Sequence, residues 1–255
     1  MCWGLSEPGE LTAAIVTGLD GSLPVVLSPR SREISAGLAA RYPDVRVCSS
    51  NQEVLDQADT VVLAVRPPVL REVVEDLTFR PEHVVLSAVA GVRVDQLRKW
   101  VAPASRVVRS IPLPQAAQRQ SLTAMYPEDA AARELFERVG GVVVPRDEPS
   151  LEAFSAATST FAAHLDYLAT IAGWMAAQGV EAETASAYVA HVFAQVGKSL
   201  AEGGPLEELT SRHMTPGGIN EQLLTHLRAG GMPESVRQGL DAVLARLRGA
   251  AGSGD

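Results

Sequence analysis

An arginine- and serine-rich segment in the first quarter of the chain offers phosphate-binding chemistry. The segment Ser28-Pro29-Arg30-Ser31-Arg32 directly follows an apolar run. Guanidinium and hydroxyl groups bind phosphate through charge-assisted hydrogen bonds. Proteins that select NAD place Asp or Glu after the corresponding strand to hold the ribose hydroxyls, and this segment has neither. Any nicotinamide dinucleotide bound here is therefore predicted to be NADPH. The alternative is a helix that starts at Ser31 between solvated arginines.

The N-terminal turn is a second candidate for coenzyme binding. Gly4, Ser6 and Gly9 surround a bend before a helical pattern, where backbone N–H groups can approach a pyrophosphate. Glu7 and Pro8 occupy the middle of this bend, so a carboxylate lies beside the expected pyrophosphate and one N–H donor is missing. A purely structural turn is the alternative. The chain begins almost at its first strand. Two further alternatives are therefore a misassigned start codon and a frayed strand.

A loop near the C-terminus is the candidate substrate site. In the segment 215–220, Thr215 is expected to cap a helix with Pro216 just inside it, followed by Gly217 and Gly218. The two glycines let a ligand carboxylate approach unpaired N–H groups. A small acid held there would present its C=N carbon to the nicotinamide, and the coenzyme carries the hydride. Thr215 would donate a hydrogen bond and Asn220 would orient the imine nitrogen. Helix capping alone is the alternative.

The histidines are weaker candidates for catalytic or metal-binding roles. His213 precedes the loop and is a candidate acid or anion ligand, with a surface histidine as the alternative. His164 lies in an apolar helical pattern, where an interface role is expected. His191 and His226 lack metal-ligand spacing, and two cysteines make neither a disulfide framework nor a zinc site, so no metal is predicted. No nucleophile elbow follows any predicted strand, which argues against Ser-His-Asp hydrolysis.

Short apolar runs in the first half predict the sheet that positions these groups. The predicted strands are 24–28, 60–65, 83–88, 106–109 and 141–144, and the predicted helices between them are 31–41, 51–58, 69–76, 94–100 and 130–139. The runs do not alternate with polar residues, which indicates burial on both faces and a mainly parallel sheet. Strands alternating with helices predict a doubly wound, Rossmann-like α/β domain.

The second half has no strand pattern. The run 150–178 is long and apolar, yet too polar for a membrane span, so it is expected to be a helix covered by another subunit. Further helices are predicted at 181–202, 206–212, 218–229 and 233–248. We therefore predict a dinucleotide-binding domain over 1–148, a helical substrate and dimerisation domain over 149–248 and a disordered tail over 249–255. A homodimer or larger homo-oligomer is expected through 150–178 and 181–202.

Composition limits the partners. The chain has 255 residues, 46% of them hydrophobic and 20% charged, so a folded core is expected. A formal net charge of −8 argues against nucleic acid or an anionic membrane surface as the main partner. No charged-then-apolar leader opens the sequence, and a cytoplasmic protein is expected.

Several stretches, taken in order, resemble the pyrroline-5-carboxylate reductase family. They are the segments 9–19, 28–31, 51–54, 58–59, 63–67, 87–92 and 215–218. They resemble the family's glycine-turn helix and its Ser-x-Arg-Ser, Asn-x-Glu-x, Ala-Asp, Val-Lys-Pro, Ser-x-x-Ala-Gly-Val and Ser-Pro-Gly-Gly motifs. The resemblance implies an NAD(P)H-dependent enzyme that reduces pyrroline-5-carboxylate, a cyclic imine, to proline. It also implies a nucleotide-binding domain followed by a helical domain that interlocks with a partner as a dimer.

The resemblance also implies roles for individual residues. Ser28, Arg30 and Ser31 would meet the adenosine phosphate, and Asn51 the adenosine ribose. The residues expected on the nicotinamide side are Val65, Arg66, Pro67, Ala90 and Gly91, and those expected to meet the substrate are Thr215, Gly217, Gly218 and Asn220.

The chain also departs from the family's motifs. Glu7 stands at a glycine position, and Ile111-Pro112-Leu113-Pro114 lacks the Asn of Met-Pro-Asn-Thr-Pro. The segment 156–161 replaces Gly-Ser-Gly-Pro-Ala-Tyr, and Asn220 replaces a hydroxyl residue. The leading hypothesis is an NADPH-dependent reductase of pyrroline-5-carboxylate in a divergent family member. The alternatives are reduction of a different imine, a deazaflavin-dependent oxidoreductase, or a non-catalytic dimeric protein.

Overall fold

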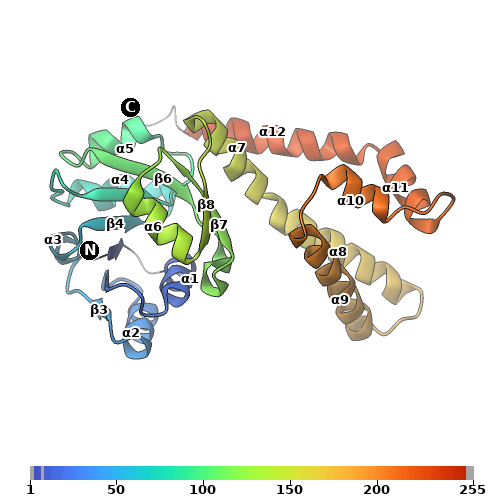
Figure 1. Cartoon of the computed structure of the whole chain (residues 1–255), viewed down its shortest axis with the longest axis horizontal. Coiled ribbons are helices and arrows are strands. Elements are labelled where there is room, and N and C mark those ends of the chain that lie inside the picture. Colours follow the sequence, from blue (N-terminus) through green and yellow to red (C-terminus); the bar gives the residue numbers. More distant parts are fainter. Residues whose placement is uncertain (1–2, 7–8, 251–255) are drawn as a thin grey trace. The chain divides into compact units, whose positions relative to one another are not determined.

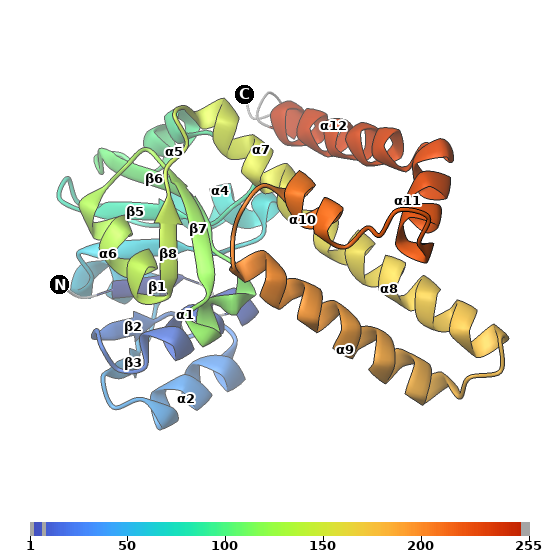
Figure 2. The same cartoon turned by 45° about the vertical axis from the view of Figure 1, so that its right-hand side comes forward.

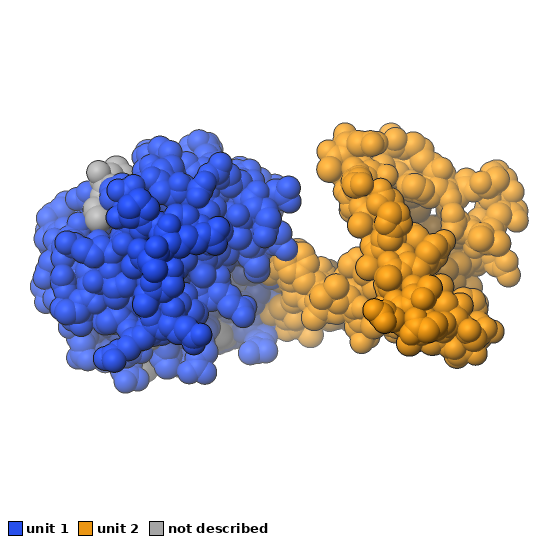
Figure 3. Space-filling model, turned by 90° about the horizontal axis from the view of Figure 1, so that it is seen from below, with its two compact units in different colours: residues 1–155, 244–255 blue, residues 156–243 orange. Residues whose placement is uncertain are grey.

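A computed structural model describes residues 3–6 and 9–250, which fall into two compact units. The first unit comprises residues 1–155 and 244–255, and the second comprises residues 156–243 (Figure 3). The N-terminal α/β fold with a helical C-terminal part agrees with the prediction.

The first unit is built on an eight-stranded sheet with the order β3-β2-β1-β4-β5-β6-β7-β8 (Figure 1). The strands are β1 (Trp3–Ser6), β2 (Val25–Leu27), β3 (Val45–Val47), β4 (Thr60–Leu63), β5 (Val84–Ser87), β6 (Arg106–Ile111), β7 (Ser121–Tyr126) and β8 (Gly140–Val143). All neighbours from β3 to β6 pair in parallel. Their carboxyl ends therefore share one edge, where doubly wound sheets bind ligands.

Helices cover both faces of this sheet. They are α1 (Glu10–Leu19), α2 (Arg32–Arg41), α3 (Asn51–Gln57), α4 (Pro67–Glu75), α5 (Val94–Trp100), η1 (Pro114–Gln118), α6 (Ala130–Arg138) and α7 (Glu148–Thr158). Ile15 of α1 and Phe136 of α6 belong to one core cluster. Leu55 of α3, Leu70 of α4 and Leu97 of α5 belong to the other. Two buried cores on opposite faces explain why the strands are apolar throughout.

Three strands are absent from the list of predicted strands, and one of them changes the sheet direction. β1 was expected only as a strand before the N-terminal turn, without bounds, and β3 and β7 were not predicted. β7 pairs antiparallel with β6, and β8 pairs parallel with β7, so β8 also runs against the first six strands. The link 112–120 between β6 and β7 is too short for a crossover to a parallel strand, which needs a dozen or more residues. β7 contains Ser121 and Thr123, whose buried hydroxyls bond to each other at 3.1 Å. These polar residues interrupt the apolar run by which the other strands were predicted.

The second unit is entirely helical over the described residues 156–243 (Figure 2). Its helices are α8 (Thr160–Ala177), α9 (Ala182–Ala201), α10 (Leu206–Arg212), α11 (Ile219–Ala229) and α12 (Met232–Ala250), the last of which ends in the first unit. α8 and α9 pack side by side. Among the described residues, none of the helices has both the length and the hydropathy of a membrane span.

Two predictions about this half were wrong. The run 150–178 is divided between α7 and α8, because at Ser159 both the N–H and the hydroxyl donate to Ala156 O. The predicted disordered tail overlaps α12, which includes Gly249 and Ala250. The rest of that predicted tail, 251–255, lies outside the described residues.

Candidate active site

The parallel strands bring most of the predicted coenzyme residues to one edge. Ser6 ends β1, with Leu63 of β4 as its partner, and Ser28 follows β2. Gly9 is the N-cap of α1, so the first turn of this helix opens at the same edge. Unpaired N–H groups in such a first turn attract anions. The predicted carboxylate and proline of the turn, Glu7 and Pro8, lie outside the described residues.

A partly buried hydrogen bond joins two of the predicted adenosine ligands. Ser28 Oγ donates to Asn51 Oδ1 at 2.6 Å and accepts from Arg30 N–H at 3.2 Å. Ser28 has no exposed surface. Because the Asn51 oxygen is occupied by Ser28, the Asn51 amide group presents its two N–H donors to a ligand.

Asn51 is available because another residue caps its helix. The sequence suggested Asn51 as the start signal, but Ser50 is the N-cap, and its hydroxyl accepts from Glu53 N–H at 3.1 Å. Glu53 in turn accepts from the N–H and hydroxyl of Ser49. These hydrogen bonds hold the pKa of Glu53 below its usual value. The pattern resembles a capping box whose cap is Ser50, one residue before Asn51, with Glu53 bonded back to Ser49.

A cavity of about 340 Å³ lies beside this pair. Its lining includes Pro29, Arg30, Asn51, Glu72 and Asp76. The segment after β2 therefore borders a cavity of a size suited to part of a small ligand.

Ser31 occupies the N-cap position of α2 without capping it. Its backbone is left-handed, with φ of 55°, and its side chain makes no capping hydrogen bond. The alternative assignment of Ser31 as an ordinary cap is therefore weakened. A non-glycine residue with positive φ is uncommon and is concentrated at functional sites.

The expected nicotinamide residues occupy two loops at the same edge. Val65 is buried, and the exposed Arg66 is the N-cap of α4, with Pro67 as the first helical residue. Ala90 is exposed and Gly91 has φ of 75°, in the turn after β5. The first unit thus brings the predicted coenzyme residues together at the carboxyl ends of β1 to β5.

The predicted substrate residues form one tight turn in the second unit. Gly218 N–H donates to Thr215 O at 2.8 Å, with Pro216 and Gly217 between them and a Gly217 φ of 72°. This matches a type II turn, which requires positive φ at its third residue. A Cβ atom on Gly218 would lie 2.8 Å from Thr215 O. Both glycines therefore have a conformational reason, independent of any ligand.

Thr215 is not the helix cap that the sequence suggested. Gly218 is the N-cap of α11, which begins at Ile219. Since the turn lies between Thr215 and the helix, the Thr215 hydroxyl is not needed for capping, and no hydrogen bond of this hydroxyl is found within the described residues.

Comparisons with known proteins cover both units. Residues 148–250 match the family described as pyrroline-5-carboxylate reductase dimerisation, and residues 9–91 match the family described as NADP oxidoreductase, coenzyme F420-dependent. The pyrroline-5-carboxylate reductase of Pseudomonas aeruginosa is 28% identical over 256 residues, covering 93% of this chain and 92% of that protein. The chain is therefore similar to pyrroline-5-carboxylate reductases over nearly its whole length, and its helical part matches their dimerisation family. It is an NAD(P)H-dependent oxidoreductase.

Solved structures show the same fold as this reductase. That of 1-pyrroline-5-carboxylate reductase from Streptococcus pyogenes has a TM-score of 0.85 at 22% identity and covers 98% of both chains. That of Plasmodium falciparum pyrroline carboxylate reductase with NADP bound has a TM-score of 0.79 at 15% identity, again over 98% of both chains.

Gly4 of the reductase has a packing reason for being glycine. It lies in the middle of β1, opposite Val26 and Val61. A Cβ atom there would lie 2.5 Å from Val54 Cγ1 and 2.9 Å from Ala58 Cβ. The close approach of α3 therefore excludes larger residues, and coenzyme contact by Gly4 stays a prediction.

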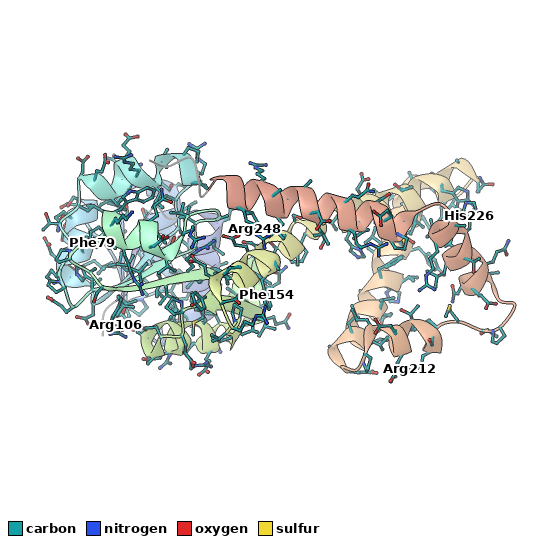
Figure 4. All side chains as sticks on the ribbon, turned by 90° about the horizontal axis from the view of Figure 1, so that it is seen from above. Phe79, Arg106, Phe154, Arg212, His226 and Arg248 are labelled. Atoms are coloured by element: carbon teal, nitrogen blue, oxygen red, sulfur yellow. The ribbon has the colours of Figure 1, made fainter. Side chains whose placement is uncertain are left out.

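Sequence reasoning missed a buried ionic cluster in the reductase. Arg109 Nη1 of β6 lies 2.8 Å from Glu148 Oε1 and 3.4 Å from Glu152 Oε1, both on α7. Arg248 Nε of α12, labelled in Figure 4, lies 3.5 Å from Glu152 Oε2. Arg109 is 3% exposed and Glu152 is 4% exposed. The available signals were an arginine inside an apolar strand and a carboxylate inside an apolar helix.

The histidines are not arranged as metal ligands in the described part of the chain. Within residues 3–6 and 9–250, no group of three or more His, Cys, Asp or Glu side chains is placed to hold a metal ion. His164 lies edge-on to Phe193, with ring centroids 6.1 Å apart. His213 contributes its carbonyl to the substrate turn, where it accepts from Asn220 Nδ2 at 2.9 Å.

Proposed function

We propose that this protein reduces a cyclic imine with NADPH, and that pyrroline-5-carboxylate, which would yield proline, is the default substrate. The hydrogen bond between Ser28 and Asn51 beside the cavity lined by Arg30 carries the coenzyme half of the proposal. The similarity to pyrroline-5-carboxylate reductases carries the reaction class. The NADP in the Plasmodium falciparum structure is consistent with this coenzyme.

The adenosine end of the coenzyme would meet polar groups that the fold has already positioned. The Asn51 amide would donate to the ribose hydroxyls, since its oxygen is held by Ser28. Arg30 and Ser31 would bind the 2′-phosphate through charge-assisted hydrogen bonds. The segment that follows β2 supplies no carboxylate to repel this phosphate.

The pyrophosphate and nicotinamide would follow the same edge. Gly4, Ser6 and Gly9 would border the pyrophosphate at the start of α1. The two nicotinamide-side segments are Val65–Pro67 and Ala90–Gly91.

The substrate would bind at the turn of the second unit. Thr215, Gly217, Gly218 and Asn220 would contact it, with the Thr215 hydroxyl donating a hydrogen bond. A dialkyl imine is largely protonated near neutral pH, so placement of its C=N carbon against the nicotinamide contributes more than a proton donor. The coenzyme supplies the hydride.

The helical part would provide the dimer. We propose a domain boundary near 148–149, and a homodimer through 150–178 and 181–202. The match of 148–250 to a dimerisation family supports this assignment.

Coenzyme selectivity tests the proposed adenosine site. Arg30→Ala is expected to weaken NADPH binding at least tenfold and NADH binding less than threefold, because only NADPH carries the 2′-phosphate that Arg30 would bind. Fluorescence titration of each coenzyme measures both affinities. Arg98→Ala on α5, an exposed arginine away from the cavity, serves as the control.

Equal losses for both coenzymes in Arg30→Ala would refute the phosphate assignment. Absence of NADPH binding by the unaltered protein at tens of micromolar would remove the reductase proposal and favour a non-catalytic dimer. Where NADPH binds, its oxidation in the presence of pyrroline-5-carboxylate tests the reaction.

A second candidate function has one supporting observation. Residues 9–91 match a family described as coenzyme F420-dependent NADP oxidoreductase. In that case NADPH would reduce the deazaflavin rather than an imine. Loss of F420 absorbance on mixing with NADPH, without consumption of pyrroline-5-carboxylate, would favour this candidate.

A further inference from the structure

The start of α5 receives a hydrogen-bond acceptor from a distant part of the chain. Arg93 is the N-cap of this helix, and its side chain makes no capping hydrogen bond. The first helical residue, Val94, donates its N–H to Glu148 Oε1 at 2.8 Å, although the two residues are 54 positions apart. A first-turn N–H has no acceptor within its own helix, and a carboxylate is favourable at a helix N-terminus. Glu148 therefore fixes the backbone where α5 begins.

The carboxylate of Glu148 is itself held by Arg109. Arg109 Nη1 donates to the same oxygen, Glu148 Oε1, at 2.8 Å, and the two side chains are only 4% and 12% exposed. In the sheet register, Arg109 lies opposite Ser87, the last residue of β5. Solvent ions screen such a buried pair little, so the carboxylate has a defined position. β6 and α7 together present one acceptor to the segment that follows β5.

The loop between β5 and α5 contains two of the expected nicotinamide residues, the exposed Ala90 and Gly91 with its positive φ. At the start of this loop, Ser110 Oγ of β6 donates to Ser87 O at 3.3 Å. At its end, the hydrogen bond from Val94 N–H holds the backbone. The turn is therefore anchored on both sides, and the second anchor is a side chain from outside the loop.

Apolar packing is the alternative explanation for the position of this loop. Val89, Val92 and Val94 are buried in the same core cluster. Glycine populates both signs of φ, so packing of the valines alone leaves the peptide groups around Gly91 several orientations. A hydrogen bond on the main chain next to this turn removes part of that freedom. Packing and hydrogen bonding thus predict different effects when Glu148 is replaced.

We propose that Glu148 is a positioning residue for the nicotinamide end of the coenzyme, and that it acts through Val94 N–H on the backbone of Ala90 and Gly91. The inference rests on the proposed function, which assigns this loop to the nicotinamide. Hydride transfer requires the reacting atoms to lie about 3–3.5 Å apart, so a displaced loop costs nicotinamide binding and transfer rate. The adenosine end of the coenzyme should be unaffected.

Calorimetric titration with two ligands tests the proposal. NADPH carries the nicotinamide, and 2′-phospho-ADP-ribose has the same adenosine phosphate and pyrophosphate without it. Glu148→Met fills a similar volume without an oxygen acceptor, and should bind NADPH at least about fivefold more weakly while binding 2′-phospho-ADP-ribose within about twofold of the unaltered protein. Glu148→Gln keeps the acceptor oxygen and should restore NADPH affinity to within about twofold.

Glu152→Met is the matched control. Glu152 lies on the same helix and also contacts Arg109, at 3.4 Å, but no hydrogen bond joins it to this loop among the described residues. The control should leave both affinities within about twofold. If Glu148→Met does not fold, Glu148→Asp takes its place, since it keeps the charge beside Arg109 and withdraws the acceptor by one methylene group. An unchanged NADPH affinity, equal losses for both ligands, or the same loss in the control overturns the proposal.

Hydrogen exchange in the unaltered protein separates this proposal from the proposed function, and neither measurement needs an imine. Deuterium uptake by residues 88–94 should slow with NADPH and not with 2′-phospho-ADP-ribose. A segment that does not respond to NADPH refutes the assignment of Ala90 and Gly91 to the nicotinamide, and the role of Glu148 with it. A segment that responds, together with unchanged NADPH affinity in Glu148→Met, overturns the role of Glu148 alone.

Discussion

Single polar residues in this protein often position a neighbour rather than a ligand. His83 is buried, accepts from Arg80 N–H on Nδ1 and contacts Leu55 O through Nε2, with both distances at 3.0 Å. This arrangement requires the neutral ring with its proton on Nε2. Arg80 also donates to Leu55 O and Ala58 O, so both side chains support the end of α3, the helix that begins at Asn51.

Stability should therefore depend on pH through His83. Burial, assisted by the charge of Arg80, lowers the pKa of His83 below its ordinary value of 6.5. Between the folded and unfolded pKa values the unfolded chain binds more protons, so the unfolding free energy is unaffected above about pH 6.5 and decreases as the pH falls below it. One such group changes this free energy by at most about 1.4 kcal/mol per pH unit.

Urea unfolding at pH 7.5 and 5.5 measures this dependence, and His83→Gln supplies the control because glutamine offers a donor and an acceptor but does not titrate in this range. The variant should lose less stability than the unaltered protein on going to pH 5.5. The same loss in both proteins would assign the pH dependence to other groups.

At the scale of elements, the buried ionic cluster joins β6 to α7 and to the end of α12. Arg109 contacts Glu148 and Glu152, and Glu148 Oε1 also accepts from Val94 N–H at 2.8 Å. Arg109 Nε is buried and has no hydrogen-bond partner among the residues that the structure describes. Removal of one partner from such a cluster destabilises the fold strongly, because it leaves buried charges uncompensated. Replacement of the whole cluster by apolar residues costs less stability.

Arg109→Met is accordingly expected to reduce the unfolding free energy by about 3–5 kcal/mol. Arg106→Met, on the same strand, is the control: Arg106 pairs with Asp129 at 2.7 Å but its side chain is 50% exposed, so a loss of at most about 1 kcal/mol is expected. Urea unfolding compares the two. Similar losses for both variants would show that burial does not distinguish these ion pairs.

At the scale of the whole molecule, the helices of the second unit leave large apolar side chains uncovered in a single chain. None of the residues of α8 is buried. Leu165 and Trp174 on α8 are 65% and 64% exposed, and Tyr188 on α9 is 59% exposed. Exposed apolar surface of this kind marks protein interfaces. It accords with the sequence-based expectation that another subunit covers 150–178.

The double substitution Leu165→Asp with Trp174→Asp should convert the oligomer to a monomer, because it places charges in the proposed interface. Light scattering after size-exclusion chromatography measures the mass. Leu122→Asp on β7 adds a charge at an equally exposed leucine, 60% exposed, outside these helices and should leave the mass unchanged. An oligomer that survives the double substitution would place the interface elsewhere.

The amino-acid sequence by itself determined the elements that follow local patterns. Apolar runs such as 60–65 predicted buried strands, and the loss of such runs after Pro149 predicted a helical second half. It also placed Ser28 and Arg30 at the end of a predicted strand and Asn51 at the start of a predicted helix, since a doubly wound fold is built from repeated strand-helix units. These inferences depend only on residue types and on their spacing along the sequence.

Only the tertiary structure decided which distant residues meet. Ser28 bonds to Asn51, Arg109 bonds to Glu152, and Gly4 lies against Val54. These contacts depend on strand register and on how the helices pack on the sheet, which no local sequence pattern encodes. The turn at 215–218 shows the same limit: its glycines were visible in the sequence, but the occupation of Gly217 N–H by Glu221 depends on the folded path of the backbone. Hydrogen-bond donors become available or unavailable to a ligand only after the chain has satisfied its own.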